Sequence, residues 1–322
     1  MKPWLTAIAA VLALAAVAGC GGNDEERELG GRGDAEAQHY ERRIARLERR
    51  LAARRAARRE RNGQQSAGAP MPEPEGFEAL AAGLGGEVRL TLGPPGGATP
   101  TSLGSFTSGS AWSTIKVVLA ARVILDRGGP SRLTSDERSL IEGAVTASDN
   151  TAADQLWAGL VTRHGGAEGA AGAVAEILRR AGDTDTVVST EGRDGFSPYG
   201  QTEWSLEAQH RFMAALAGGC LGASVGGKYL LGLMGRVIPS QRWGLGSTAL
   251  PARLKGGWGP APDGRYLVRQ MGVIETRGDR LVVTLAGSPN DGSFASGTAM
   301  LDRLGAWVAE RGPALAGGSS GC

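Results

Sequence analysis

The order of the predicted secondary-structure elements constrains the fold of this chain most strongly. Residues 86–93, GEVRLTLG, alternate apolar and polar side chains as a half-buried strand does, and 101–108 predict a second strand. Residues 265–276 and 280–288 flank the sequence RGD and predict a hairpin. Strands at both ends of a helical block predict an α+β fold. The predicted helices of that block, and one after the hairpin, are 112–125, 134–148, 152–162, 168–181, 205–217 and 292–311.

The residues before 77 predict a spacer that is separate from this folded body. Residues 62–76, NGQQSAGAPMPEPEG, are rich in Pro, Gly and Ser and predict a linker, so a domain boundary is expected near Phe77. Residues 41–61 hold ten Arg and three Glu and predict a helix. A coiled-coil spacing lasts there for only about two heptads, so we expect a solvated, Arg-rich helical spacer and linker over 21–76. The alternative is a basic helix that lies on anionic lipid or on a cell-wall polymer.

The first 20 residues resemble a bacterial lipoprotein signal. Lys2 precedes an apolar run at 5–19 that is too short to span a bilayer comfortably, and the run ends in small residues before Cys20. The resemblance implies that Cys20 is lipidated and anchors an extracytoplasmic protein to the cell membrane. An ordinary secretory signal is the alternative. An extracytoplasmic location permits a disulfide between Cys220 and Cys322, although two unpaired thiols remain equally open.

Charge and histidine content exclude several other classes of function. From Phe77 onward the chain carries 22 basic and 22 acidic residues, which argues against a nucleic-acid partner. The three histidines, His39, His164 and His210, form no pair four residues apart of the kind that binds zinc on a helix. The sequence has no P-loop and no dinucleotide fingerprint. We therefore expect no metal and no cofactor, and the sequence leaves the oligomeric state open.

A serine and a lysine begin the first predicted helix. Ser113 and Lys116 are three residues apart in GSAWSTIKVV, so a helix presents both on one face. A serine becomes a nucleophile when a neighbouring base takes its proton, and a lysine can be that base when burial lowers its pKa. Ser-x-x-Lys alone is a weak signal, because two surface residues of a helix produce the same pattern.

Two further segments follow this pair in a characteristic order. Ser148-Asp149-Asn150 precedes a predicted helix, and Lys255-Gly256-Gly257 precedes the predicted hairpin. Each has a structural interpretation as well, since Ser, Asp and Asn cap helices and Lys-Gly-Gly fits a strand that ends in a bulge. The ordered triple S-x-x-K, S-D-N, K-[TSG]-G resembles the serine β-lactamase and penicillin-binding protein superfamily, and within it the class A β-lactamases. The resemblance covers residues 77–322.

The resemblance implies both a fold and a set of roles. The fold would be an antiparallel sheet flanked by helices, with a reduced all-helical lobe, because only 34 residues separate Ser113 from Ser148. Ser113 would be the acylated nucleophile and Lys116 its base. The remaining roles are proton relay to the leaving nitrogen by Ser148, substrate binding by Asn150, Lys255 and Gly257, and an oxyanion hole from the backbone N–H groups of Ser113 and Trp258.

The sequence departs from the family pattern at two places. Gly256 stands where the family usually has Thr or Ser, so a hydroxyl that helps to hold a substrate carboxylate is absent. The family's E-x-x-L-N segment, whose Glu activates the deacylating water, is also absent. Glu191 lies near the expected place, and we expect it either to activate that water or to be a solvated loop carboxylate.

Two arginines follow the third motif. In related enzymes, arginines at such positions pair with a substrate carboxylate, and by resemblance Arg265 or Arg269 would do so here. For either arginine taken alone, the default expectation is a side chain that faces solvent.

Three functions fit these observations. The first is a serine hydrolase that opens β-lactams through an acyl-enzyme at Ser113. The second is a peptidoglycan D,D-peptidase or penicillin-binding enzyme, whose substrate is a stem peptide and which needs no loop Glu. The third is a non-catalytic cell-wall binding module of the same fold.

Overall fold

The computed structural model describes residues 76–97, 99–276 and 279–315, which all fall within one compact unit of the chain, 73–322. The expectations for Cys20, for the Arg-rich helix at 41–61 and for Cys322 lie outside the described residues. Among the described residues, no helix is long and apolar enough to cross a membrane.

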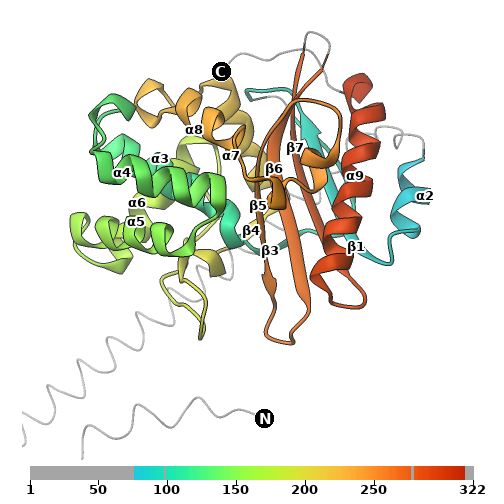
Figure 1. The fold of residues 1–322 in the computed structure, drawn as a ribbon, viewed down its shortest axis with the longest axis horizontal. Coiled ribbons are helices and arrows are strands. Elements are labelled where there is room, and N and C mark those ends of the chain that lie inside the picture. Colours follow the sequence, from blue (N-terminus) through green and yellow to red (C-terminus); the bar gives the residue numbers. More distant parts are fainter. Residues whose placement is uncertain (1–75, 98, 277–278, 316–322) are drawn as a thin grey trace, which may run out of the picture. The chain divides into compact units, whose positions relative to one another are not determined.

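A five-stranded antiparallel sheet forms the centre of the fold, as the sequence predicted (Figure 1). The strand order is β2-β1-β7-β6-β5, so the strands from the two ends of the chain lie side by side in the middle and β5 forms one edge. The predicted hairpin is β6 and β7, in which Glu275 faces Arg280. The strands are β1 (Gly86–Gly93), β2 (Thr101–Gly104), β5 (Ala252–Pro260), β6 (Tyr266–Glu275) and β7 (Arg280–Pro289).

Helices cover both faces of this sheet, which explains why β6 and β7 are buried along almost their whole length. Helix α9 (Phe294–Leu315) packs on one face, where Leu301 joins the apolar cluster that contains Val283. Helix α7 (Leu206–Gly218) packs on the other face, where Phe212 shares a cluster with Val282. Because neighbouring residues of a strand point to opposite faces, Val282 and Val283 serve different cores. The short helix α2 (Phe77–Ala82) contacts α9 through an edge-to-face pair of Phe77 and Trp307.

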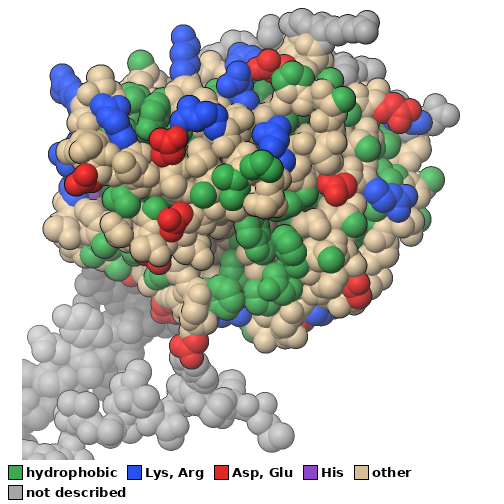
Figure 2. Space-filling view, in the orientation of Figure 1, with side chains coloured by type: hydrophobic (Ala, Val, Ile, Leu, Met, Phe, Trp, Pro, Cys, Tyr) green, Lys and Arg blue, Asp and Glu red, His purple; other side chains and the backbone are tan. Residues whose placement is uncertain are grey.

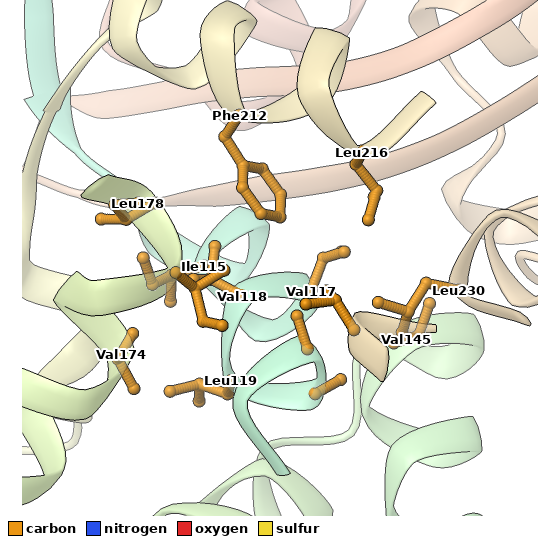
Figure 3. Close-up of a cluster of buried hydrophobic side chains, with 14 of the residues drawn as sticks. Ile115, Val117, Val118, Leu119, Val145, Val174, Leu178, Phe212, Leu216 and Leu230 are labelled. Carbon is orange, nitrogen blue, oxygen red and sulfur yellow. The ribbon is translucent and has the colours of Figure 1, made fainter. Parts of the chain in front are cut away.

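A helical lobe lies beside the sheet and is organised around α3 (Lys116–Asp126) (Figure 1). Nine of the 11 residues of α3 are buried, so helices must surround it. Ile115, Val118 and Leu119 meet Val174 and Leu178 of α6 in the cluster of Figure 3. The surrounding helices are α4 (Ser135–Glu142), α5 (Asn150–Arg163), α6 (Ala167–Arg180) and α8 (Gly227–Met234). Helix α4 begins with a capping box of Thr134 and Glu137.

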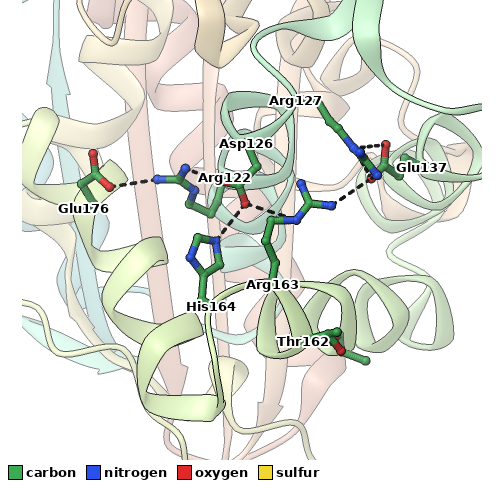
Figure 4. Close-up of polar contacts among 9 residues, drawn as sticks. Arg122, Asp126, Arg127, Glu137, Thr162, Arg163, His164 and Glu176 are labelled. Atoms are coloured by element: carbon green, nitrogen blue, oxygen red, sulfur yellow. Dashed lines mark hydrogen bonds and ion pairs between the residues drawn. The ribbon is translucent and has the colours of Figure 1, made fainter.

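Ion pairs join α3 to its neighbours in the lobe (Figure 4). Asp126 accepts a hydrogen bond from Arg122 and lies 2.9 Å from Nε2 of His164. Arg122 also donates to Glu176 of α6 at 2.9 Å. Because the side chains of Arg122 and Asp126 are only 9% and 6% exposed, this pair is shielded from solvent and fixes α3 against α5 and α6.

A two-stranded ribbon of β3 (Ser108–Ser110) and β4 (Glu203–Ser205) lies next to the start of α3. Arg269 of β6 holds it by donating to the carbonyls of Gly109, Ser110 and Trp204 and to Oε1 of Gln209. The default expectation of a solvent-facing side chain was therefore wrong for Arg269, which is fully buried. Its guanidinium satisfies backbone carbonyls that the short ribbon leaves unpaired.

The loop after α7 contains a covalent link. Cys220 is disulfide-bonded. Cys322, the partner considered from the sequence, lies outside the described residues.

Candidate active site

Ser113 lies in a short 3-10 helix, Trp112–Ile115, that leads directly into α3. The backbone of Trp112 is strained, with φ of 47°, a value that non-glycine residues seldom adopt. Packing explains how the strain is tolerated, because the indole of Trp112 lies against the face of Gly259, where a Cβ atom would approach the ring to 2.5 Å. Strain of this kind concentrates at functional sites, since only a well-packed surrounding holds it.

Lys116, the first residue of α3, turns its amine into the protein. Its side chain is buried, and Nζ donates to the carbonyl oxygen of Ser148 and to Oδ1 of Asn150, both at 2.7 Å. Burial lowers the pKa of Lys116 to about 8, although the negative charges of Asp154 and Asp149 act to raise it. Near neutral pH a usable fraction of this amine is therefore unprotonated, as a general base must be.

The second motif caps a helix and also contacts the two lysines of the site. A π-helical turn, Gly143–Ala147, ends at Ser148, whose φ of 57° is the second positive value among the described non-glycine residues. Asp149 then caps α5 by accepting from the N–H of Ala152 at 3.1 Å. The capping interpretation thus holds for Asp149, while Ser148 and Asn150 contact the two lysines of the site.

Lys255 reaches the same serine from the sheet. It is fully buried on β5, and Nζ donates to Oγ of Ser148 at 2.8 Å and to the carbonyl of Gly256 at 2.9 Å. Burial, and then the charge of Lys116, hold the pKa of Lys255 well below its usual value. Ser148 therefore lies between two amines, and one of them bonds its hydroxyl.

Glycines on β5 let this edge strand approach the start of α3 closely. A Cβ atom at Gly257 would lie 2.9 Å from the backbone nitrogens of Ser113 and Thr114, so only glycine fits there. At Gly256 a Cβ atom would lie 2.6 Å from the indole of Trp243. The indole of Trp243 thus occupies the space that a Thr or Ser side chain at position 256 would need.

A cavity of about 420 Å³ lies between the lobe and the edge strand. Five of the predicted residues line it: Ser113, Lys116, Ser148, Asn150 and Trp258. Lys255 and Gly257 do not line the cavity but contact residues that do, since Lys255 bonds Ser148 and Gly257 lies against the backbone of Ser113. Figure 2 shows hydrophobic side chains gathered in the middle of this face, over β5. The aromatic residues that line the cavity are Trp112, Phe196, Tyr199, Trp258 and Tyr266.

Glu191 is the predicted catalytic residue that the structure does not bring into the cavity. It is exposed, and its backbone N–H and carbonyl both bond to Oγ of Ser189. Arg265 and Arg269 do not line the cavity either. Arg265 is exposed and donates to the carbonyl of Pro289 at 3.4 Å, whereas Arg269 holds the β3–β4 ribbon.

The sequence interpretation missed the pair of Asp154 and Tyr199. Both line the cavity, and the hydroxyl of Tyr199 donates to Oδ1 of Asp154 at 2.6 Å. Asp154 follows Asn150 by four residues on α5, so helical spacing from the second motif was the signal that could have found it. Tyr199 carried no such signal, because it lies in an isolated turn of 3-10 helix, Tyr199–Gln201.

Arg193 fixes the loop that carries Tyr199. Its guanidinium donates to Oε1 of Gln201 at 2.8 Å and to the carbonyl of Pro260 at 2.5 Å, and so joins the loop to the end of β5. It also lies over the ring of Phe196, 4.8 Å from the centroid. Within the described part of the chain, no group of His, Cys, Asp and Glu side chains is arranged to hold a metal ion.

Solved β-lactamases share this fold. An ancestral (GNCA) class A β-lactamase is similar with a TM-score of 0.56 at 19% identity, covering 73% of this chain and 98% of its own. A β-lactamase from Burkholderia vietnamiensis gives 0.58 at 17% identity, over 77% of this chain and 98% of its own. A class A β-lactamase from Mycobacterium abscessus gives 0.54 at 15% identity, over 72% and 97%. No family model matches the sequence, and no curated protein matches it either.

The chain therefore has a serine β-lactamase-like fold, and its solved neighbours include class A β-lactamases. This confirms the α+β architecture, with an antiparallel sheet and a helical lobe, that the motif order implied.

Proposed function

We propose that this protein is a serine hydrolase that opens the amide bond of a β-lactam through an acyl-enzyme at Ser113. The observation that carries the proposal is the shared contact of two buried lysines with Ser148, next to Ser113 in one cavity. Two amines with lowered pKa values, one at the carbonyl and one at the hydroxyl of the same serine, provide a proton acceptor and a relay, which a structural serine does not need.

Acylation would proceed as follows. Neutral Lys116 takes the proton of Ser113 as Oγ attacks the carbonyl carbon of the amide. Backbone N–H groups of Ser113 and Trp258 stabilise the oxyanion that forms. The C–N bond then breaks, and Ser148 gives its proton to the leaving nitrogen and takes one from the Lys116 ammonium group, while Lys255 bonds its oxygen. The product is an ester between the substrate acyl group and Oγ of Ser113.

A second function has one observation in its favour. Glu191 lies outside the cavity, so the loop carboxylate that the family uses to release the acyl group has no counterpart at that position. A penicillin-binding D,D-peptidase that acts on peptidoglycan stem peptides acylates at the same serine and releases β-lactams slowly.

One experiment separates these functions. Wild type and Ser113→Ala are mixed with a labelled penicillin, and the intact mass is followed over time. A hydrolase gives an adduct that forms and disappears, whereas a D,D-peptidase gives an adduct that persists. The change Ser139→Ala, at an exposed serine of α4, is the matched control and should label like wild type. Absence of any wild-type adduct would contradict both enzymes and favour the non-catalytic cell-wall module.

We also propose that a lipid on Cys20 anchors the protein to the cell membrane, as the signal-like N-terminus suggests. The change Cys20→Ser should move the protein from the membrane fraction to the soluble extracytoplasmic fraction. An unchanged distribution would contradict the anchor.

A further inference from the structure

A carboxylate that the motifs do not contain faces the acylation site. Asp154 lies one helical turn after Asn150 on α5 and lines the same cavity as Ser113 and Lys116. It is exposed at the cavity wall, so solvent water reaches it. Asn150 bonds the amine of Lys116, and residues four apart on a helix lie on one face, which places Asp154 beside that amine.

Tyr199 fixes the orientation of this carboxylate. Its hydroxyl donates to Oδ1 of Asp154 at 2.6 Å, which leaves Oδ2 as the second acceptor of a residue that lines the cavity. Burial, and then the hydrogen bond to Asp154, raise the pKa of Tyr199, so its hydroxyl keeps its proton and remains a donor. The tyrosine is itself held, because it is 1% exposed and its ring lies 5.7 Å from that of Trp157.

We propose that Asp154 is the general base that hydrolyses the acyl-enzyme, with Tyr199 as its positioning residue. This inference rests on the proposed acylation of Ser113. In the related enzymes a loop Glu has this role. No Glu among the residues that the structure describes lines the cavity of this protein, and Asp154 on α5 takes the role instead.

The reaction balances with the groups present. Asp154 takes one proton from a water molecule as the water oxygen forms a bond to the ester carbonyl carbon. The N–H groups of Ser113 and Trp258 hold the resulting oxyanion. Its collapse breaks the bond to Oγ of Ser113, which takes a proton from Lys116 while Lys116 takes the proton held by Asp154. The substrate leaves as a carboxylic acid, and Asp154 and Lys116 return to their starting protonation states.

Asp154 also affects the acylation half of the reaction. The charged groups around Lys116 are Asp154 on α5, Asp149 at the N-cap of that helix and Lys255 on β5. The two carboxylates raise the pKa of Lys116 against the larger effect of burial. Removal of the Asp154 charge therefore lowers the pKa of Lys116 further, and more of the amine is neutral at pH 7. Removal of the Asp154 charge should therefore slow deacylation without slowing acylation. Loss of a purely structural residue would slow both half-reactions.

The test measures both half-reactions with a chromogenic β-lactam and time-resolved intact mass. Asp154→Asn keeps the shape of the side chain and should slow deacylation by about 100-fold or more, so that the adduct accumulates. Its acylation rate at pH 7 should equal or exceed that of wild type, and the pH midpoint of acylation should move downward. Asp154→Glu should restore part of the turnover, and Tyr199→Phe should slow deacylation less than Asp154→Asn does.

Asp136→Asn, an exposed carboxylate of α4, is the matched control and should behave as wild type. The proposal is overturned if wild type forms and releases the adduct and Asp154→Asn releases it equally fast, or if Glu191→Gln stalls instead. If wild type never forms an adduct, the proposed acylation of Ser113 is wrong, and the failure lies in the proposed function rather than in the role of Asp154. Thermal melts of each variant identify any change that comes from unfolding.

Discussion

The side-chain nitrogen of Lys255 lies 2.8 Å from Oγ of Ser148, although Lys255 comes 107 positions later in the chain. The contact joins the edge strand of the sheet to the turn that begins α5 in the helical lobe. Both acceptors of Lys255, this hydroxyl and the carbonyl of Gly256, are neutral. A buried amine without a carboxylate partner costs stability, which points to a role in chemistry.

Substitution of Lys255 should therefore separate stability from activity. In Lys255→Met the buried amine is replaced by an apolar chain of similar length, so we expect the free energy of unfolding to stay equal or to rise by about 1–2 kcal/mol. Acylation of Ser113 should fall at least tenfold, because Ser148 loses its proton partner. Urea unfolding and adduct formation measure the two effects. A large loss of stability would show that the lysine is structural.

The rate of acylation should depend on pH through Lys116. The base must be neutral, and burial lowers its pKa to about 8. The rate should therefore rise with pH up to about 8 and then level off, since the amine is already deprotonated above its pKa. Stopped-flow measurement of adduct formation between pH 6 and about 10 gives the profile. A rate that is flat over this range would exclude Lys116 as the base.

The indole of Trp243 lies against Gly256, so we expect the threonine that the family usually has at this position to destabilise the protein. Gly256→Thr places a Cβ atom 2.6 Å from the indole and should destabilise the protein by about 1–3 kcal/mol. The double change Gly256→Thr with Trp243→Ala should recover part of that loss, because the ring no longer occupies the site. Thermal unfolding measures both. Gly232→Ala in α8 is the control, since nothing lies within 4 Å of its added Cβ.

The ion pair of Arg122 and Asp126 should matter far more than an exposed pair in the same lobe. Asp126→Ala leaves the guanidinium of Arg122, in a side chain only 9% exposed, without its nearest carboxylate and should cost about 3 kcal/mol. Glu142→Ala breaks a pair with Arg236 in which the side chains are 53% and 60% exposed, and should cost at most about 1 kcal/mol. Equal losses in urea unfolding would contradict the assigned difference in solvent screening.

Local patterns predicted the strands and helices because each depends on residues close in sequence. The strand β1 and the β6–β7 hairpin appear as expected, although β1 is buried on both faces from Leu90 onward rather than half-buried. Helix α8 and the ribbon of β3 and β4 were not predicted, since short elements carry few periodic positions. Arg269 was expected to face solvent because arginines usually do, and nothing nearby in the sequence reveals the four acceptors that bury it.

The sequence by itself determined the fold class and the identity of the three motifs, since strand and helix periodicity and motif order are properties of the chain. Only the tertiary structure decided which carboxylate faces the cavity. The sequence indicated Glu191 and gave no assignment for Asp154, but the loop leaves Glu191 outside the cavity while helical geometry and Tyr199 hold Asp154 at the cavity wall. The physical reason is that a loop conformation depends on distant contacts, here those of Arg193 with Gln201 and with Pro260 on β5, which no local pattern records.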